Sequence, residues 1–116
     1  GILIDMHGEA TSEKNAFGHF FDGKVSAILG THTHIPTADA KILSGGTAYQ
    51  TDVGMTGDYD SVIGMDKQNP IHSFTKGFRS EGRFIPATGE IKICGSYIEI
   101  DDKTGFSRKI HPFQIY

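Results

Sequence analysis

Two short apolar runs frame the first third of the chain. Residues 2–5 and residues 25–29 consist mainly of Ile, Leu, Val and Ala. Runs of this length predict strands, and the first is typical of a strand that is covered on both faces within a parallel sheet. A helical pattern lies between them, so the three segments predict a β-α-β unit with a right-handed crossover.

The helical pattern covers residues 11–22. Ala16 and Phe20, like Phe17 and Phe21, are apolar residues four positions apart, and this spacing gives a helix one apolar face. Hydroxyl side chains at positions 11 and 12 are expected to cap the first N–H groups of this helix. His19 lies between the phenylalanines and is expected to be exposed.

The middle of the chain has weaker patterns. Residues 38–43 are long enough only for a turn or a small strand, and residues 47–51 suit a strand. Residues 52–60 carry two glycines and three acids and are expected to form a loop. Residues 66–76 predict a second helix.

The last third of the chain alternates between apolar and polar residues. The alternation and its turn residues predict a three-stranded antiparallel meander over residues 84–85, 90–100 and 106–116. Its apolar phase shifts between Ile93 and Ile98. A bulge near Gly95 is expected to absorb the shift.

Histidines close both strands of the predicted β-α-β unit. His7 follows the first strand, and His32 and His34 follow the second. In an extended backbone, side chains two residues apart point the same way and lie about 6.6 Å apart, so His32 and His34 can reach one metal ion or two adjacent ions. Because ligands of open α/β sheets gather at the carboxyl ends of the strands, all three histidines are expected to converge there.

These histidines cannot complete a two-metal site alone. Neutral imidazole is a good ligand for zinc, iron, manganese or copper, but two divalent ions held by three histidines would keep about four positive charges. Carboxylates are therefore required. Candidates within the chain are Asp5, Glu9, Asp39 and Asp52, and the alternative is that the acids lie upstream of this chain.

Composition narrows the class of protein. A chain of 116 residues is one domain or a piece of one, and 11 basic against 14 acidic residues, with no basic cluster, do not predict a surface for duplex nucleic acid. The single cysteine, Cys94, excludes an internal disulfide and suits a reducing cytoplasm. Apolar runs are far shorter than the roughly 20 residues of a membrane helix, so no membrane contact is expected.

The beginning of the chain is unusual for a complete domain. Gly1 is not an initiator methionine, and the apolar run of residues 2–4 follows it without a turn or a cap. We therefore expect a chain that starts in the middle of a fold.

Several blocks of sequence, in order, resemble the YmdB-like metallophosphoesterases of the calcineurin-like superfamily. The blocks are DMHGEATSEK at 5–14, DGKVSA at 22–27, GTHTH at 30–34 with Thr37 and Asp39, GTAY at 46–49, TDVGMTG at 51–57 and SVIG at 61–64. The resemblance covers essentially the whole chain and places residues 1–116 in the C-terminal half of one such domain. Gly8, where the family commonly has Ala, and Asp58, where Pro is common, are departures from its pattern.

The resemblance implies a fold and an activity. The fold is α/β, a partial α/β/β/α sandwich in which a β-α-β unit is followed by a mixed sheet and C-terminal antiparallel hairpins. The activity is hydrolysis of phosphodiesters, including 2′,3′-cyclic nucleotides, at a binuclear centre of iron or manganese ions. His7 and His32 resemble ligands of one metal and His34 a ligand of the other, and the family's remaining ligands and its general acid lie in an N-terminal half that this chain lacks.

The resemblance also leads to expectations about the site residues of this chain and about its binding partners. No catalytic residue is expected on the fragment, which would be inactive alone with a partial or empty metal site. Glu9, Asp39 and Asp52 are candidates for orienting the histidines or facing the substrate. Association with the missing half, or with further copies of the chain, is expected.

Two other interpretations remain open. The chain could be a non-catalytic module that keeps a partial metal site and associates with itself through exposed sheet edges. Alternatively, His7, His32 and His34 with one carboxylate could form a structural zinc site.

Overall fold

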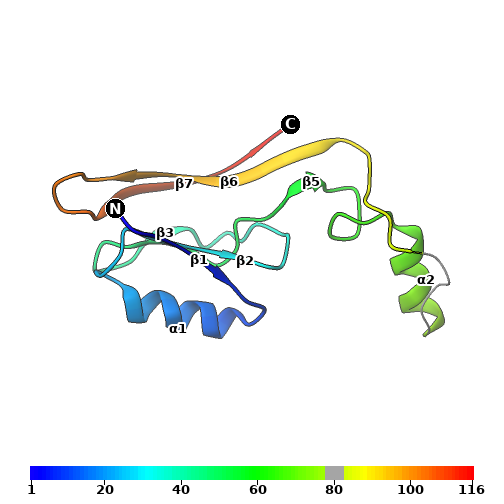
Figure 1. Cartoon of the computed structure of the whole chain (residues 1–116), viewed down its shortest axis with the longest axis horizontal. Helices are drawn as coiled ribbons and strands as arrows, with labels where there is room; N and C mark the ends of the chain where they lie inside the picture. The colour runs from blue at the N-terminus through cyan, green and yellow to red at the C-terminus, as the bar shows by residue number, and fades with distance from the viewer. Residues whose placement is uncertain (78–82) are drawn as a thin grey trace.

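The structure of the protein is a computed structural model, which describes residues 1–77 and 83–116. Its elements follow one another along the chain as shown in Figure 1. In order they are β1 (Leu3–His7), α1 (Thr11–Phe21), β2 (Ala27–Thr31), β3 (Lys41–Ile42), β4 (Ala48–Gln50), β5 (Thr56–Asp58), α2 (Gln68–Lys76), β6 (Ile91–Ile100) and β7 (Ser107–Ile115).

The first four strands form one mixed sheet in the order β1-β2-β4-β3. Strands β1, β2 and β4 are parallel, and β3 runs antiparallel to β4. His7, the last residue of β1, is paired with Thr31, the last residue of β2. The predicted β-α-β unit is therefore confirmed, and the two strands end at the same edge of the sheet.

Helix α1 packs on one face of this sheet. Phe17 and Phe21 pack against a buried cluster of Val25, Ile28, Leu43 and Tyr49. The approach of helix to sheet is close at Gly18, where an added Cβ would lie 2.7 Å from the Tyr49 ring. Only glycine allows this separation, so Gly18 sets the distance between α1 and the core.

Three details of this unit differ from the prediction. Strand β1 lies at the edge of its sheet and is not covered on both faces, so that Leu3 is 63 % exposed. Helix α1 has Ala10 as its N-cap and no side-chain capping bond, because Thr11 is already the first helical residue. Phe20 is 66 % exposed since it lies off the stripe that faces the core, whereas the expected exposure of His19 is confirmed.

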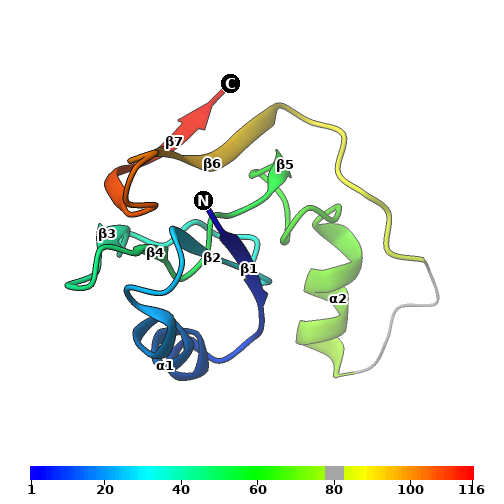
Figure 2. The same cartoon turned by 60° about the vertical axis from the view of Figure 1, so that its left-hand side comes forward.

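A second sheet, of order β5-β6-β7, lies over the opposite face of the first (Figures 1 and 2). Polar contacts join the two sheets. The Ser107 hydroxyl donates to the carbonyl of Ser26 at 2.7 Å, and the Ser96 hydroxyl donates to the side-chain oxygen of Gln50. Helix, mixed sheet and antiparallel sheet thus form successive α, β and β layers of the expected sandwich.

The second sheet corrects two predictions. Its third strand is β5, which lies in the segment expected to be a loop and pairs with Ile91–Ile93, whereas residues 84–85 belong to no named strand. The register shift lies between Glu99 and Ile100. Gly95 stays in regular register opposite Phe113, and its lack of a side chain makes room for the Phe113 ring.

Helix α2 confirms the second predicted helix and stands beside the sheets, after β5 (Figure 2). Its C-cap, Gly77, has a φ of 71°, the left-handed conformation that favours glycine at a helix end. Within the described residues, neither helix is long and apolar enough to cross a membrane.

Candidate metal centre

The strands of the β-α-β unit bring two of the predicted histidines together. Nε2 of His7 and Nδ1 of His32 lie 3.0 Å apart, and the two rings meet edge to face with centroids 4.9 Å apart. The contact arises because β1 and β2 end side by side, so that His7 and the residue after β2 share one edge of the sheet.

The surrounding hydrogen bonds indicate where the ring protons lie. The Thr31 hydroxyl donates to Asp5 at 2.8 Å, so it can accept the Nδ1–H of His7 at 2.9 Å, and Nε2 of His7 keeps a lone pair. Glu9 lies 2.7 Å from Nε2 of His32 and accepts its N–H. In a neutral His32 ring, Nδ1 then also keeps a lone pair.

This assignment directs two lone pairs into the same space. Two electron pairs facing each other at 3.0 Å require a shared proton or a cation between them. Two nitrogens bound side by side to one ion at about 2.1 Å lie about 3.0 to 3.4 Å apart. The donor types and spacing of His7 and His32 therefore fit two ligands of one metal ion.

The third predicted ligand, His34, is held separately. Its Nδ1 lies 2.8 Å from the backbone carbonyl of Ile63 and donates to it, which leaves Nε2 with the lone pair. His32, His34 and Ile63 have positive φ values of 136°, 67° and 49° and are the non-glycine residues of the described chain with this conformation. Backbone strain of this kind concentrates at functional sites, where the surrounding structure imposes it.

A buried ion pair holds the segment of residues 32–34, called here the histidine loop, in place. Asp52 accepts hydrogen bonds from the N–H groups of Thr33 at 2.8 Å and Gly54 at 2.9 Å. Lys14 of α1 lies 3.3 Å from Asp52 and also donates to the Thr31 carbonyl. Burial would raise the pKa of Asp52, but the hydrogen bonds from Thr33, Gly54 and Lys14 outweigh it and hold this pKa below the usual range.

Asp39 has a similar supporting position. Its carboxylate accepts hydrogen bonds from the Thr37 hydroxyl at 2.6 Å and from the Thr51 N–H and hydroxyl. Burial opposes ionisation, but these bonds lower the pKa of Asp39 overall. Among the described residues, neither Asp39 nor Asp52 is hydrogen-bonded to a histidine ring, whereas Glu9 is.

The donor set remains incomplete within this chain. Across residues 1–77 and 83–116, no three His, Cys, Asp or Glu side chains form a group that could hold a metal ion. His7 and His32 are in contact with each other, and Nδ1 of His34 is hydrogen-bonded to the Ile63 carbonyl.

Sequence reasoning missed three contributors to this site. Lys14 lies on the same helical stripe as Phe17 and Phe21. A lysine on an apolar stripe indicates that its charge is paired with a buried acid, which here is Asp52. Thr31 is the last residue of β2 and places a hydroxyl directly before His32. For the carbonyl of Ile63, which holds His34, the sequence carries no signal.

Known proteins resemble this chain in sequence and structure. A family model described as YmdB-like protein matches residues 1–113. The 2′,3′-cyclic-nucleotide 2′-phosphodiesterase of Bacillus subtilis is 51 % identical over 109 residues, which are 94 % of this chain and 40 % of the relative.

Solved structures agree with this match. A novel phosphatase from Mycoplasma pneumoniae superposes with a TM-score of 0.89 at 43 % identity, over 96 % of this chain and 39 % of the other. A hypothetical protein from Thermus thermophilus gives the same TM-score at 42 % identity, over 97 % and 43 % of the two chains. The chain thus spans about two fifths of the length of these relatives.

Proposed function

The chain belongs to the YmdB-like family, and on that premise we propose that it supplies the histidine side of a metal-dependent phosphodiesterase site. The observation that carries the proposal is the 3.0 Å separation of Nε2 of His7 and Nδ1 of His32, which both carry a lone pair when the two rings are neutral and hydrogen-bonded as described. The proposed substrate is a phosphodiester of the 2′,3′-cyclic nucleotide class, which the name of the Bacillus subtilis relative specifies for that protein.

The chain's own residues would hold and orient the metal ligands. His7 and His32 would share one divalent ion and His34 would bind a second, with iron or manganese as the proposed metals. Thr31, linked to Asp5, and Glu9 fix the ring orientations through the second nitrogens, as partners of metal-bound histidines do. When bound, such ions lower the pKa of a water molecule and neutralise charge on the phosphate.

Carboxylate ligands and the catalytic acid are proposed to come from outside this chain. Three neutral imidazoles supply no negative charge against two divalent ions. Asp39, which is half-buried, and Asp52, which is buried, are engaged in holding backbone and hydroxyl groups. A site completed by a further segment of the protein, or by an associated chain, would supply the missing carboxylates.

A cytoplasmic location is part of the proposal, because Cys94 is the single cysteine of the sequence.

One observation favours the alternative of a non-catalytic, self-associating module. Strand β1 leaves a sheet edge on which Ile2 and Leu3 are 57 % and 63 % exposed, and exposed apolar edges promote pairing with another chain. Light scattering after size exclusion tests this alternative, since a monomer would contradict it.

Hydrolysis of 2′,3′-cyclic AMP with Mn²⁺ tests the proposed function. The assay compares this chain with a family-length protein that contains it, and adds His32→Ala and His19→Ala variants of the longer protein. The proposal expects activity in the longer protein only, lost in His32→Ala and kept in His19→Ala. Equal activity in both lengths, or full activity in His32→Ala, would contradict it.

A further inference from the structure

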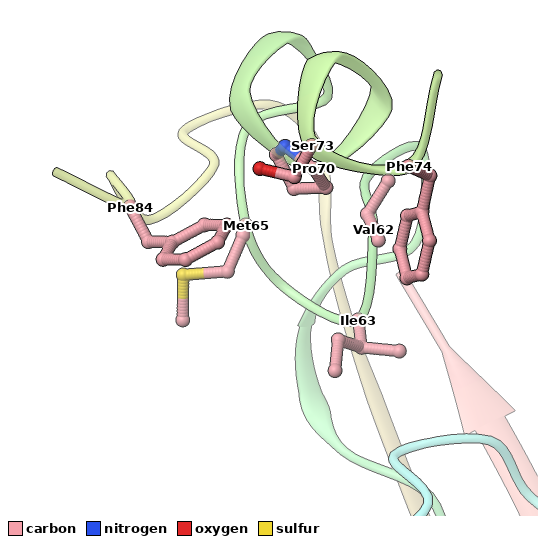
Figure 3. A pocket seen from close by; sticks show the side chains of 7 residues that line it. All are labelled: Val62, Ile63, Met65, Pro70, Ser73, Phe74 and Phe84. Atoms are coloured by element: carbon pink, nitrogen blue, oxygen red, sulfur yellow. The ribbon is translucent and has the colours of Figure 1, made fainter. Parts of the chain in front are cut away.

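An apolar pocket lies between α2 and the segment that follows β5. Its volume is about 460 Å³, within the range of small-molecule sites. Figure 3 shows Phe84 and Met65 on one side and Val62 and Phe74 on the other, with α2 above and Ile63 below. The lining residues are Val62, Ile63, Met65, Pro70, Ser73, Phe74 and Phe84, none of which is charged.

One polar group in this wall lacks a partner. The Ser73 hydroxyl is buried and has no hydrogen-bond partner within the part of the chain that the structure describes. Figure 3 shows its oxygen directed toward the side on which Phe84 and Met65 lie. Buried hydroxyls are normally hydrogen-bonded, so an unpaired one in an apolar wall suits a ligand with a polar edge.

The pocket adjoins the candidate metal centre through a single residue. Ile63 contributes its side chain to the pocket and its carbonyl to Nδ1 of His34, at 2.8 Å. Its φ of 49°, followed by a φ of 95° at Gly64, makes it the first central residue of a tight turn in which Val62 and Met65 exchange backbone hydrogen bonds. A ligand could therefore contact the pocket and the histidines at the same time.

We propose that this pocket is a subsite for a nucleobase. An uncharged pocket would not take the phosphate, but exposed aromatic rings such as Phe84 offer a stacking surface for a flat, neutral heterocycle. The Ser73 hydroxyl turns about one bond and can donate to or accept from the edge of the base. Placing the phosphate of the same ligand at the histidines rests on the proposed function, whereas the affinity of the pocket for the base does not.

Binding of adenosine, which has no phosphate, tests the subsite directly. Calorimetric titration compares the chain with Phe84→Leu and Ser73→Ala, and with the matched variants Phe20→Leu and Ser12→Ala on the exposed surface of α1. Loss of stacking in Phe84→Leu is expected to weaken adenosine binding about tenfold. Loss of one neutral hydrogen bond in Ser73→Ala is expected to weaken it about threefold to tenfold, and the matched variants should bind as the unchanged chain does.

Two further ligands sharpen the result. Ribose 5-phosphate, which lacks a base, should not compete with adenosine, and indole, which has a single N–H and no acceptor on its edge, should bind more weakly than adenosine. Absence of adenosine binding would overturn the proposal. So would folded Phe84→Leu and Ser73→Ala variants that both bind adenosine as tightly as the unchanged chain. Indole binding as tightly as adenosine would overturn it too, by identifying a general apolar groove.

Failure of the subsite and failure of the proposed function are distinguishable. Adenosine binding without hydrolysis of a cyclic nucleotide by the longer protein would retain the subsite and reject the phosphodiesterase site. Hydrolysis without adenosine binding would reject the subsite alone. His7→Ala should abolish hydrolysis and leave adenosine binding unchanged, because His7 is not part of the pocket wall.

Discussion

Lys14 and Asp52 form an ion pair in the interior of the protein, with Nζ and Oδ2 3.3 Å apart and side chains 1 % and 0 % exposed. Asp52 also binds the N–H of Thr33, the residue between His32 and His34. Helix α1, the segment after β4 and the histidine loop are therefore joined at one point. The geometry of the candidate metal centre depends on this buried pair as well as on the strands.

Replacing one partner of this pair should destabilise the protein strongly. Lys14→Met would leave the Asp52 carboxylate buried without its cation, and breaking a buried pair in this way typically costs about 3 to 5 kcal/mol. Urea denaturation measures the loss. Lys109→Met removes the partner of Glu99 in an exposed pair and should change the free energy of unfolding little, and equal effects of the two substitutions would contradict burial as the cause.

Asp52→Asn should also destabilise the protein, and it should weaken metal binding in the molecules that remain folded. An amide retains an oxygen for one backbone N–H but loses the charge that pairs with Lys14, so the histidine loop is held less firmly. Substitutions of groups that orient metal ligands typically lower affinity about 10- to 100-fold. Calorimetric titration with Mn²⁺ measures this, and Asp22→Asn, a carboxylate beside Gly45 and Thr47, is the control. Unchanged Mn²⁺ affinity in Asp52→Asn would show that Asp52 does not position the loop.

Two glycines near the site should respond oppositely to alanine. At Gly30, an added Cβ would lie 1.7 Å from the Thr51 carbonyl oxygen, so Gly30→Ala must displace β2 or the chain beyond β4. Overpacking costs about 1 to 3 kcal/mol and sometimes more. At Gly8 the nearest atom is 3.9 Å away, and Gly8→Ala should be tolerated. Thermal unfolding of both variants decides, and a Gly30→Ala protein as stable as Gly8→Ala would contradict the packing described for β2.

The stability of the protein should fall in acid because of three aspartates. Asp22, Asp39 and Asp52 have pKa values below the ordinary 3.8. For Asp22, burial raises the pKa, but the hydrogen bonds from Gly45, Thr47 and Ser44 together outweigh it. Each carboxylate therefore binds a proton less readily in the folded than in the unfolded chain.

The sign of the pH effect follows from this difference. The stabilisation is fully present above the unfolded pKa near 3.9 and is lost as the pH falls through the lower folded values. Urea denaturation from pH 7 to pH 3 should show a falling free energy of unfolding below about pH 5, with a smaller fall in Asp22→Asn. A free energy that rises on acidification would contradict the hydrogen-bonded state of these carboxylates.

The fold of the first third was predictable because its signals are local. Apolar runs fixed β1 and β2, the spacing of Phe17 and Phe21 fixed α1, and parallel pairing then required His7 and the histidines after β2 to approach one edge. Exposure was harder to predict, as Phe20 shows. A four-residue spacing identifies a helix, but the width of its buried stripe is set by what packs against it.

The features that the sequence did not reveal depend on distant partners. Strand β5 contains Gly57 and Asp58, which disfavour strands, and forms because β6 pairs with it from more than 30 residues away. Lys14 is buried because Asp52, 38 residues along the chain, neutralises it. Ile63, whose carbonyl holds His34 from 29 residues along the chain, occupies a positive-φ position of the turn between Val62 and Met65, where a β-branched residue gives no sequence signal.

Binding of Mn²⁺ by the histidines is the most direct test of the central claim. Electron paramagnetic resonance of the free ion measures affinity in a family-length protein that contains this chain, in its His7→Ala and His32→Ala variants, and in His19→Ala as an exposed control. Since His7 and His32 offer lone pairs to one point, His7→Ala and His32→Ala should each abolish the tighter of the two Mn²⁺-binding steps. His19→Ala should retain it. Mn²⁺ affinity that is the same in all four folded proteins would contradict the assignment of His7 and His32 as ligands.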